Sequence, residues 1–98
     1  MTWQIYILEC SNGSYYVGHT ENLQARIQAH QSGKGATHTA KYRPVRCVYA
    51  EHAPDKATAM KREKQLKKWS RAKKEALIKG DLPTLKQLAK SNQVRTKP

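Results

Sequence analysis

Two side chains able to bind oxyanions or transfer protons lie on what should be a buried helical stripe. Arg26 and His30 are four residues apart and share the stripe with Leu23 and Ile27, so they would stand one turn apart near the sheet. An arginine can hold a phosphate through two parallel hydrogen bonds, and a histidine titrates near neutral pH. The alternative is structural, with Arg26 at the helix edge covering the core with its aliphatic stem.

A single carboxylate shows the same pattern on a later helix. Glu63 lies three or four residues from Ala59, Met60 and Leu66, which define the apolar side of that helix. A buried carboxylate is costly unless it is paired with a cation or bound to a metal ion. The sequence leaves both interpretations open, because many lysines are near enough to pair with it.

The strongest signal in the composition is positive charge. The 98 residues include 19 Lys and Arg against 7 Asp and Glu, a net charge of +12, and ten of the basic residues lie between Lys56 and Lys79. Such a surface predicts a polyanionic partner, nucleic acid before an anionic membrane, with a merely well-solvated surface as the alternative. We expect phosphate contacts from Lys34, Lys41, Arg43, Lys61, Lys64, Lys67, Lys68, Arg71, Lys73 and Lys74.

The remaining composition predicts a cytoplasmic protein without a membrane partner. The first residues do not resemble a signal peptide, and no apolar run approaches the roughly 18 residues that a membrane helix needs. Cys10 and Cys47 form no CxxC pair, and no histidines stand at zinc-binding spacing from them. We therefore expect both cysteines to be reduced and to act as small apolar residues.

The elements that must position these residues are short. Strands are predicted at 3–9, 15–19 and 45–49, a helix of about 12 residues from the N-cap Thr20 to before Gly33, and a loop at 33–42. Further helices are predicted at 56–68 after Asp55, at 71–79 between Ser70 and Gly80, and at 82–89, followed by a basic tail at 94–98. This order predicts an α/β (α+β) fold with a small three-stranded, mainly antiparallel sheet flanked by three to four helices, in the order ββαβαα.

These residues together resemble the GIY-YIG endonuclease family, and most closely its small, stand-alone, single-domain bacterial members. The two half-motifs appear as Gln4-Ile5-Tyr6 and Tyr16-Val17-Gly18, and the arginine, histidine and glutamate of the family fall on Arg26, His30 and Glu63. The stretch 32–45 also resembles this subgroup. Gln4 replaces the usual glycine, and no asparagine occurs between residues 24 and 91, where many relatives carry one. The resemblance implies a GIY-YIG-like nuclease domain at 1–80, with a short C-terminal helix and tail at 81–98.

The resemblance implies a metal-dependent DNA endonuclease that serves DNA repair, recombination or turnover. Tyr6, Tyr16, Arg26, His30 and Glu63 would be catalytic, with Arg26 holding the scissile phosphate and either a tyrosine or His30 acting as general base. A free tyrosine has a pKa of about 10, so nearby cations would have to lower it, whereas a histidine needs no such help. His19 and His38 are secondary candidates, for which a surface or turn position is the simpler interpretation.

The acidic residues bear on the metal cofactor. All seven Asp and Glu residues are scattered along the sequence, and no DxD pair is present that could hold two metal ions. A nuclease built from these residues should therefore use one divalent ion, Mg²⁺ or Mn²⁺, with Glu63 as its ligand. The expected partner is DNA, in single-stranded, duplex or branched form, and a partner protein could supply sequence specificity. The alternative function is a non-catalytic basic module that only binds nucleic acid.

The expected site also predicts the turn between the first two strands. Tyr6 and Tyr16 must project from the same face, and side chains alternate along a strand, so the numbers of paired residues must sum to an even number. A two-residue Asn12-Gly13 loop would pair Ser11 with Ser14 and separate the tyrosines. We therefore expect a three-residue loop at 11–13, with Gly13 in the left-handed conformation and Tyr6 opposite Gly18.

Overall fold

The computed structural model describes residues 2–87 of the chain. The chain divides into two compact units, Met1–Lys67 and Lys68–Pro98. In the second unit the helix expected at 82–89 is seen over residues 82–87. The remainder of that helix and the tail expected at 94–98 lie outside the described residues.

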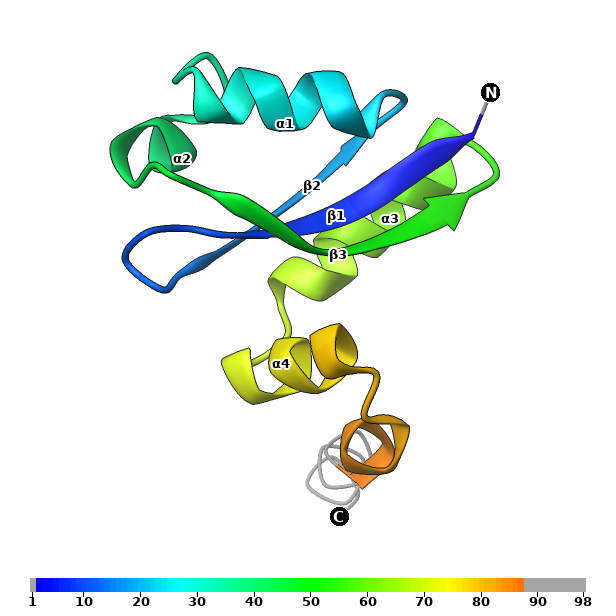
Figure 1. The fold of residues 1–98 in the computed structure, drawn as a ribbon. Helices are drawn as coiled ribbons and strands as arrows, with labels where there is room; N and C mark the ends of the chain where they lie inside the picture. Colours follow the sequence, from blue (N-terminus) through cyan, green and yellow to red (C-terminus); the bar gives the residue numbers. More distant parts are fainter. Residues whose placement is uncertain (1, 88–98) are drawn as a thin grey trace. The chain divides into compact units, whose positions relative to one another are not determined.

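The first unit is built on a three-stranded antiparallel sheet with the order β2-β1-β3. Its strands are β1 (Trp3–Glu9), β2 (Tyr15–Thr20) and β3 (Arg46–Ala53), so the third strand is longer than the predicted 45–49. Ile5, Tyr6, Ile7 and Leu8 of the central strand are all at most 1% exposed. Four buried residues in succession require cover on both faces of the sheet, and helices supply it (Figure 1). The α+β architecture predicted from the sequence is confirmed.

The hairpin has the predicted register. Tyr6 pairs with Gly18 and Leu8 with Tyr16, so the two tyrosines share one face of the sheet. The backbone N–H of Cys10 donates to the Ser14 carbonyl at 2.8 Å, which closes a three-residue loop. Gly13 has a φ of 85°, a left-handed conformation that residues with a Cβ rarely adopt.

Helix α1 (Leu23–Gln31) covers the tyrosine face, where Leu23 and Ile27 pack against the buried cluster around Tyr6. Its N-cap is Asn22, whose Oδ1 accepts a hydrogen bond from the Ala25 N–H at 3.1 Å. The predicted N-cap Thr20 is wrong, and the helix has nine residues rather than about 12. Thr20 still belongs to β2, and its hydroxyl bonds within the turn to the backbone of Asn22.

Part of the segment predicted as a loop at 33–42 is helical. Helix α2 spans Thr37–Lys41 and follows α1 on the same side of the sheet in Figure 1. A five-residue helix has no apolar periodicity to reveal it, and its formation depends on tertiary contacts. One of these contacts involves Thr39, the buried residue of α2.

Helix α3 (Lys56–Lys67) covers the opposite face of the sheet. Asp55 caps it as predicted, since its Oδ1 accepts from the Thr58 N–H at 2.8 Å. Ala59 and Leu66 are fully buried, but Met60, which the pattern assigned to the apolar side, is 49% exposed. The apolar stripe of α3 is therefore narrower than predicted, and polar contacts flank it.

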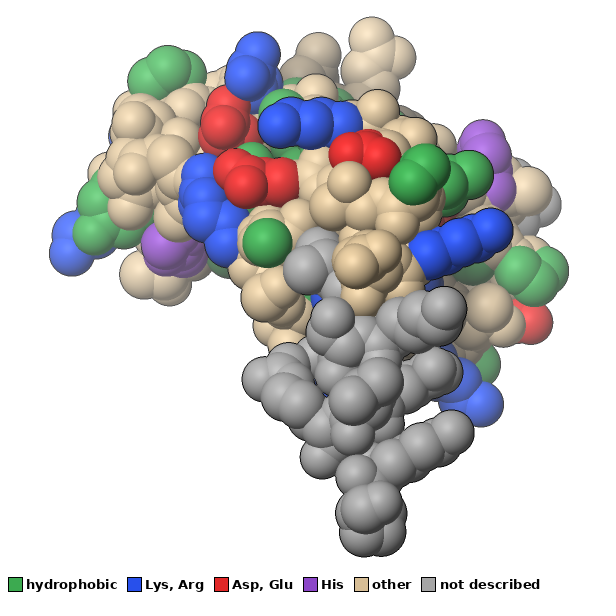
Figure 2. Space-filling model, turned by 90° about the horizontal axis from the view of Figure 1, so that it is seen from below, with side chains coloured by type: hydrophobic (Ala, Val, Ile, Leu, Met, Phe, Trp, Pro, Cys, Tyr) green, Lys and Arg blue, Asp and Glu red, His purple; other side chains and the backbone are tan. Residues whose placement is uncertain are grey.

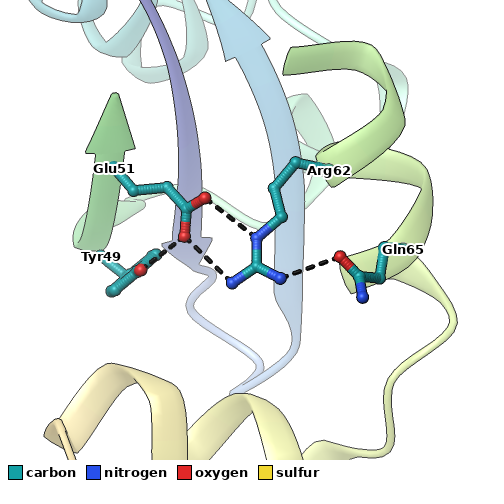
Figure 3. A network of polar contacts seen from close by, with 4 residues as sticks. All are labelled: Tyr49, Glu51, Arg62 and Gln65. Atoms are coloured by element: carbon teal, nitrogen blue, oxygen red, sulfur yellow. Dashed lines mark hydrogen bonds and ion pairs between the residues drawn. The ribbon is translucent and has the colours of Figure 1, made fainter. Parts of the chain in front are cut away.

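One of these polar contacts joins α3 to β3, the far edge of the sheet (Figure 3). Arg62 donates to both carboxylate oxygens of Glu51, at 2.9 and 3.2 Å, and to Gln65 at 2.9 Å. The Tyr49 hydroxyl donates to the same carboxylate at 2.6 Å. Burial, followed by this hydrogen bond to Glu51, raises the pKa of Tyr49 to about 12, so the phenol remains a donor at neutral pH.

The second unit contains α4 (Arg71–Lys79), which has the predicted ends. Ser70 accepts a hydrogen bond from the Lys73 N–H, and Gly80 ends the helix with a φ of 69°. No helix in the described part of the chain is long and apolar enough to cross a membrane. Both cysteines are free, with Cys10 buried and Cys47 half-buried.

Replacing Glu51 should loosen α3 from the sheet. We expect Glu51→Gln to lower the free energy of unfolding by about 1 kcal/mol, because the two-point contact with Arg62 is partly buried. In a domain of this size that corresponds to a fall in Tm of about 4–8 °C, measurable by circular dichroism. Glu75→Gln, which removes a more exposed pair with Arg71, is the control and should change stability by less than about 0.5 kcal/mol. Equal effects would contradict a bracing role for Glu51.

Candidate active site

Tyr6 is the most deeply buried tyrosine of the candidate site, and its side chain crosses the edge strand β2. Tyr6 comes from the central strand and is 1% exposed, and its ring extends over Gly18 of β2. A Cβ added at Gly18 would lie 2.4 Å from the Tyr6 hydroxyl oxygen, closer than any side chain could stand. The absence of a side chain at Gly18 therefore lets the Tyr6 hydroxyl reach the β2 edge of the sheet.

His30 is the hydrogen-bond partner of this hydroxyl. Its Nε2 lies 2.9 Å from the Tyr6 oxygen, and its Nδ1 lies 2.7 Å from the hydroxyl oxygen of Thr39. His30 and Thr39 are both 0% exposed. Burial, together with the charge of Arg26, lowers the pKa of His30, so the ring is neutral at neutral pH. With both nitrogens bonded and no exposed surface, the imidazole is shielded from solvent.

Arg26 and Tyr16 complete the cluster on this face. The hydrogen bond to Tyr6, as the largest cause, raises the pKa of Arg26 against the effect of burial, and Tyr16 contributes in the same direction. The Tyr16 ring centroid lies 6.5 Å from that of Tyr6 and 5.1 Å from that of His30. Four of the five predicted catalytic residues, Tyr6, Tyr16, Arg26 and His30, are therefore brought together.

The fifth residue, Glu63, approaches from the other face of the sheet. Its Oε1 lies 2.6 Å from His19 Nδ1, and its Oε2 lies 3.0 Å from Lys67 Nζ. Burial opposes ionisation of Glu63, but the hydrogen bonds from His19 and Lys67 outweigh it and lower its pKa. The Glu63 carboxylate is thus charged at neutral pH. Of the two interpretations that the sequence left open, pairing with a lysine is the one that this structure shows for Glu63.

The edge strand β2 joins the two halves of the site. Gly18 and His19 are consecutive, so they face opposite sides of the sheet, one toward Tyr6 and the other toward Glu63. Burial raises the pKa of Tyr6, the hydrogen bond from Arg26 opposes this, and the charges of Tyr16 and, to a smaller extent, Glu63 raise it further. His19, a secondary candidate in the sequence, is the β2 residue that contacts Glu63.

A cavity of about 580 Å³ lies beside Glu63 and His19. Three of the predicted nucleic-acid contacts line it, namely Lys61, Lys64 and Lys67 of α3. Their positive charge would draw an anionic chain toward the carboxylate, which would otherwise repel it.

The other predicted contacts are distributed more widely. Lys34, Lys41 and Arg43 are exposed near α2, where Arg43 donates hydrogen bonds to the carbonyls of Ala40 and Gln31. The contacts in the second unit are Lys68, Arg71, Lys73 and Lys74, and Lys73 lies 4.8 Å from the centroid of the half-buried Trp69 ring. The face in Figure 2 shows basic side chains beside acidic ones rather than one unbroken basic patch.

The donor set restricts the metal that the site could hold. Within residues 2–87, no three His, Cys, Asp or Glu side chains come together as a metal-binding group. A Zn²⁺ site, which requires three or four protein ligands, does not fit. A hydrated Mg²⁺ or Mn²⁺ fits, because it can use one carboxylate and fill its remaining positions with water and phosphate oxygens. Glu63 is ionised, borders the cavity and has lone pairs beyond those bonded to His19 and Lys67.

The chain is similar to several known proteins. Residues 2–76 match the family model of the GIY-YIG catalytic domain. The UPF0213 proteins of Staphylococcus aureus strains Mu3 and COL are each 44% identical over 75 residues, which cover 76% of this chain and 92% of each relative. The solution NMR structure of a UPF0213 protein from Bacillus halodurans has a TM-score of 0.52 at 44% identity, and the match covers 81% of this chain and 84% of that one. All five residues of the candidate site lie within the range matched by the family model.

Lys67 should compete with a divalent ion for Glu63. We expect Lys67→Met to strengthen Mn²⁺ binding by about two- to fivefold, because an exposed ion pair contributes about 0.5–1 kcal/mol. Electron paramagnetic resonance titration of free Mn²⁺ would measure the change. Lys64→Met removes the same charge from the cavity wall without removing a contact to Glu63, and it should have a smaller effect. Unchanged affinity in Lys67→Met would show that the lysine does not compete.

Proposed function

The chain belongs to the GIY-YIG catalytic domain family, and on that premise we propose that it is a divalent-metal-dependent endonuclease that hydrolyses phosphodiester bonds in DNA. The observation that carries the proposal is the buried Tyr6–His30 hydrogen bond, which lies beside Arg26, near the edge strand whose His19 contacts Glu63 of α3. Phosphate binding does not require such a pair, whereas transfer of a proton from water does. The basic residues of α3 would bind the DNA backbone.

Arg26 is proposed to hold the scissile phosphate. Its guanidinium is charged at every relevant pH and offers two parallel donors, which match two phosphate oxygens. It also interacts with the oxygen of Tyr6, so a phosphate bound there would stand next to the tyrosine. This arrangement would place the phosphorus within reach of a water molecule on the tyrosine hydroxyl.

Tyr6 is proposed as the general base, with His30 as the group that receives its proton. The raised pKa of Tyr6 makes a standing phenolate unfavourable, so the tyrosine must lose its proton as it gains one from water. His30 is neutral and lies 2.9 Å away. Both of its ring nitrogens are already hydrogen-bonded, Nε2 to Tyr6 and Nδ1 to Thr39, so it is placed to act on the water through Tyr6. In the concerted step the water proton passes to the Tyr6 oxygen, the Tyr6 proton passes to His30 Nε2, and the hydroxide attacks phosphorus. The bond from phosphorus to the leaving oxygen breaks, its electron pair stays on that oxygen, and the oxygen then takes a proton from solvent. Tyr16 would orient the water or the phosphate.

Glu63 would hold the metal ion, with His19 fixing the carboxylate. When bound there, Mg²⁺ would supply positive charge for the phosphoryl and leaving oxygens. Lys67, released from Glu63, would then be available to contact a phosphate. We propose that the enzyme serves DNA repair or recombination, and the form of DNA that it cuts would distinguish these roles. A partner protein would supply any sequence specificity.

A nuclease assay with matched variants tests this function. With Mg²⁺ or Mn²⁺, the protein should cut single-stranded, duplex or branched DNA, and EDTA should abolish cutting. Arg26→Ala and Glu63→Ala should each lower the cleavage rate by at least about a hundredfold, because each removes charge stabilisation of the transition state. Both should retain most DNA binding, measured by fluorescence anisotropy, while Glu75→Ala, in an exposed acid outside the site, should remain active.

The same assay separates the two candidate functions. Tight, salt-sensitive binding without metal-dependent cutting of any of the three DNA forms would identify a non-catalytic binding module. Equal losses of cutting and binding in Arg26→Ala would assign that arginine to general affinity rather than to the reaction.

The pH dependence of cleavage should report His30. As pH falls, His30 gains a proton and can no longer accept one from Tyr6, so the rate should fall through the pKa of His30. Burial and Arg26 lower that pKa, which puts the ascending limb of the pH–rate profile below the ordinary histidine value of about 6.5. A limb above about pH 8 would instead indicate a tyrosine that must ionise before reaction.

A further inference from the structure

We propose that Thr39 is a positioning residue for the reaction, and that it sets which nitrogen of His30 carries the proton. The catalytic consequence rests on the proposed nuclease function, but the assignment of the tautomer rests on the hydrogen bonds alone. Thr39 comes from α2, in the segment where the sequence indicated only a loop.

The direction of the hydrogen bonds follows from what each atom can do. The Thr39 hydroxyl lies 2.9 Å from the backbone carbonyl of Ala36 and 2.7 Å from His30 Nδ1. The carbonyl can only accept, and the hydroxyl has one proton, so Thr39 donates to Ala36. Its oxygen must then accept from His30, which requires the proton of the neutral ring to lie on Nδ1.

This assignment fixes the role of the other ring nitrogen. Since a neutral imidazole carries one proton, Nε2 is left as an acceptor facing the Tyr6 hydroxyl at 2.9 Å. Tyr6 therefore donates to His30, the direction in which its proton must travel when it takes one from water. The opposite tautomer would present Nε2–H to Tyr6, with no lone pair able to receive a proton.

The surroundings leave the ring little freedom to adopt another arrangement. A Cβ added at Gly35 would lie 2.2 Å from His30 Nδ1, so the backbone between α1 and α2 packs directly on the ring. Two contacts hold α2 to the hairpin: the Ser11 N–H donates to the Tyr42 carbonyl at 2.9 Å, and His38 Nε2 lies 2.7 Å from the Ser14 hydroxyl. Thr39 is thus held against His30 by contacts that lie outside the candidate active site.

The test reads the tautomer directly by nuclear magnetic resonance. In protein labelled with ¹⁵N, long-range correlations within the His30 ring distinguish protonated Nδ1 from protonated Nε2. At a pH above the ordinary histidine pKa of about 6.5, wild type should show protonated Nδ1. Protonated Nε2 in wild type would overturn the proposal, whether or not the protein cuts DNA.

Three variants then test the consequence. Thr39→Val keeps the shape but removes the hydroxyl, so it should shift His30 toward protonated Nε2 and lower kcat about ten- to a hundredfold, with KM little changed. Thr39→Ser should restore both the wild-type tautomer and the rate. Thr37→Val, at an exposed threonine of the same helix, should match wild type in both. A wild-type tautomer in folded Thr39→Val would refute the positioning role.

If Thr39→Val does not fold, as judged by circular dichroism, the wild-type spectrum still decides the tautomer assignment, and a different tautomer in Thr39→Ser, which keeps the hydroxyl, would contradict the role of that hydroxyl. A wild type with protonated Nδ1 but no nuclease activity on any DNA form would leave the tautomer assignment standing and reject the proposed function instead.

Discussion

The buried hydrogen bond between Tyr6 and His30 is the constraint on which the rest of the candidate site depends. It joins the central strand to the last turn of α1, and it forms in a region where neither side chain has more than 1% of its surface exposed. A buried polar group without a partner costs about 1–3 kcal/mol, so each side chain requires the other. Gly18 makes the arrangement sterically possible, because the Tyr6 ring occupies the volume that a side chain would fill there.

The same burial sets the electrostatics of this pair. Removing a group from water disfavours its charged form, which raises the pKa of Tyr6 and lowers that of His30. Both side chains are therefore uncharged at neutral pH, and transfer of a proton from Tyr6 to His30 requires a change elsewhere to drive it. Arg26 favours loss of the tyrosine proton, while Glu63 acts against it. A metal ion held by Glu63, as proposed, would offset that second effect.

The features predicted correctly from the sequence were those fixed by local geometry. The family resemblance required Tyr6 and Tyr16 to share one face, and the alternation of side chains along a strand then gave their register and the three-residue loop, because a shift by one residue would separate them. Helix α2 could not be found in this way, since its five residues carry no periodic pattern and are held by contacts distant in sequence. Thr39 was therefore missed, although it touches a predicted site residue. Met60 was assigned to the apolar side of α3, although it is exposed, because the periodicity of apolar residues locates the buried stripe of a helix but does not give its width.

Helix α3 holds the carboxylate of Glu63 beside the edge strand β2 of a small sheet. Arg62 and Glu63 are consecutive and diverge to opposite edges of the sheet, Arg62 to Glu51 on β3 and Glu63 to His19 on β2. Between them, Ala59 and Leu66 supply the buried contact that holds the helix to the sheet. Because the Arg62 contact does not involve Glu63, the proposed exchange of Lys67 for a metal ion would leave this contact of the helix in place. The contact that holds α3 to β3 is thus separate from the one that would change in the proposed reaction.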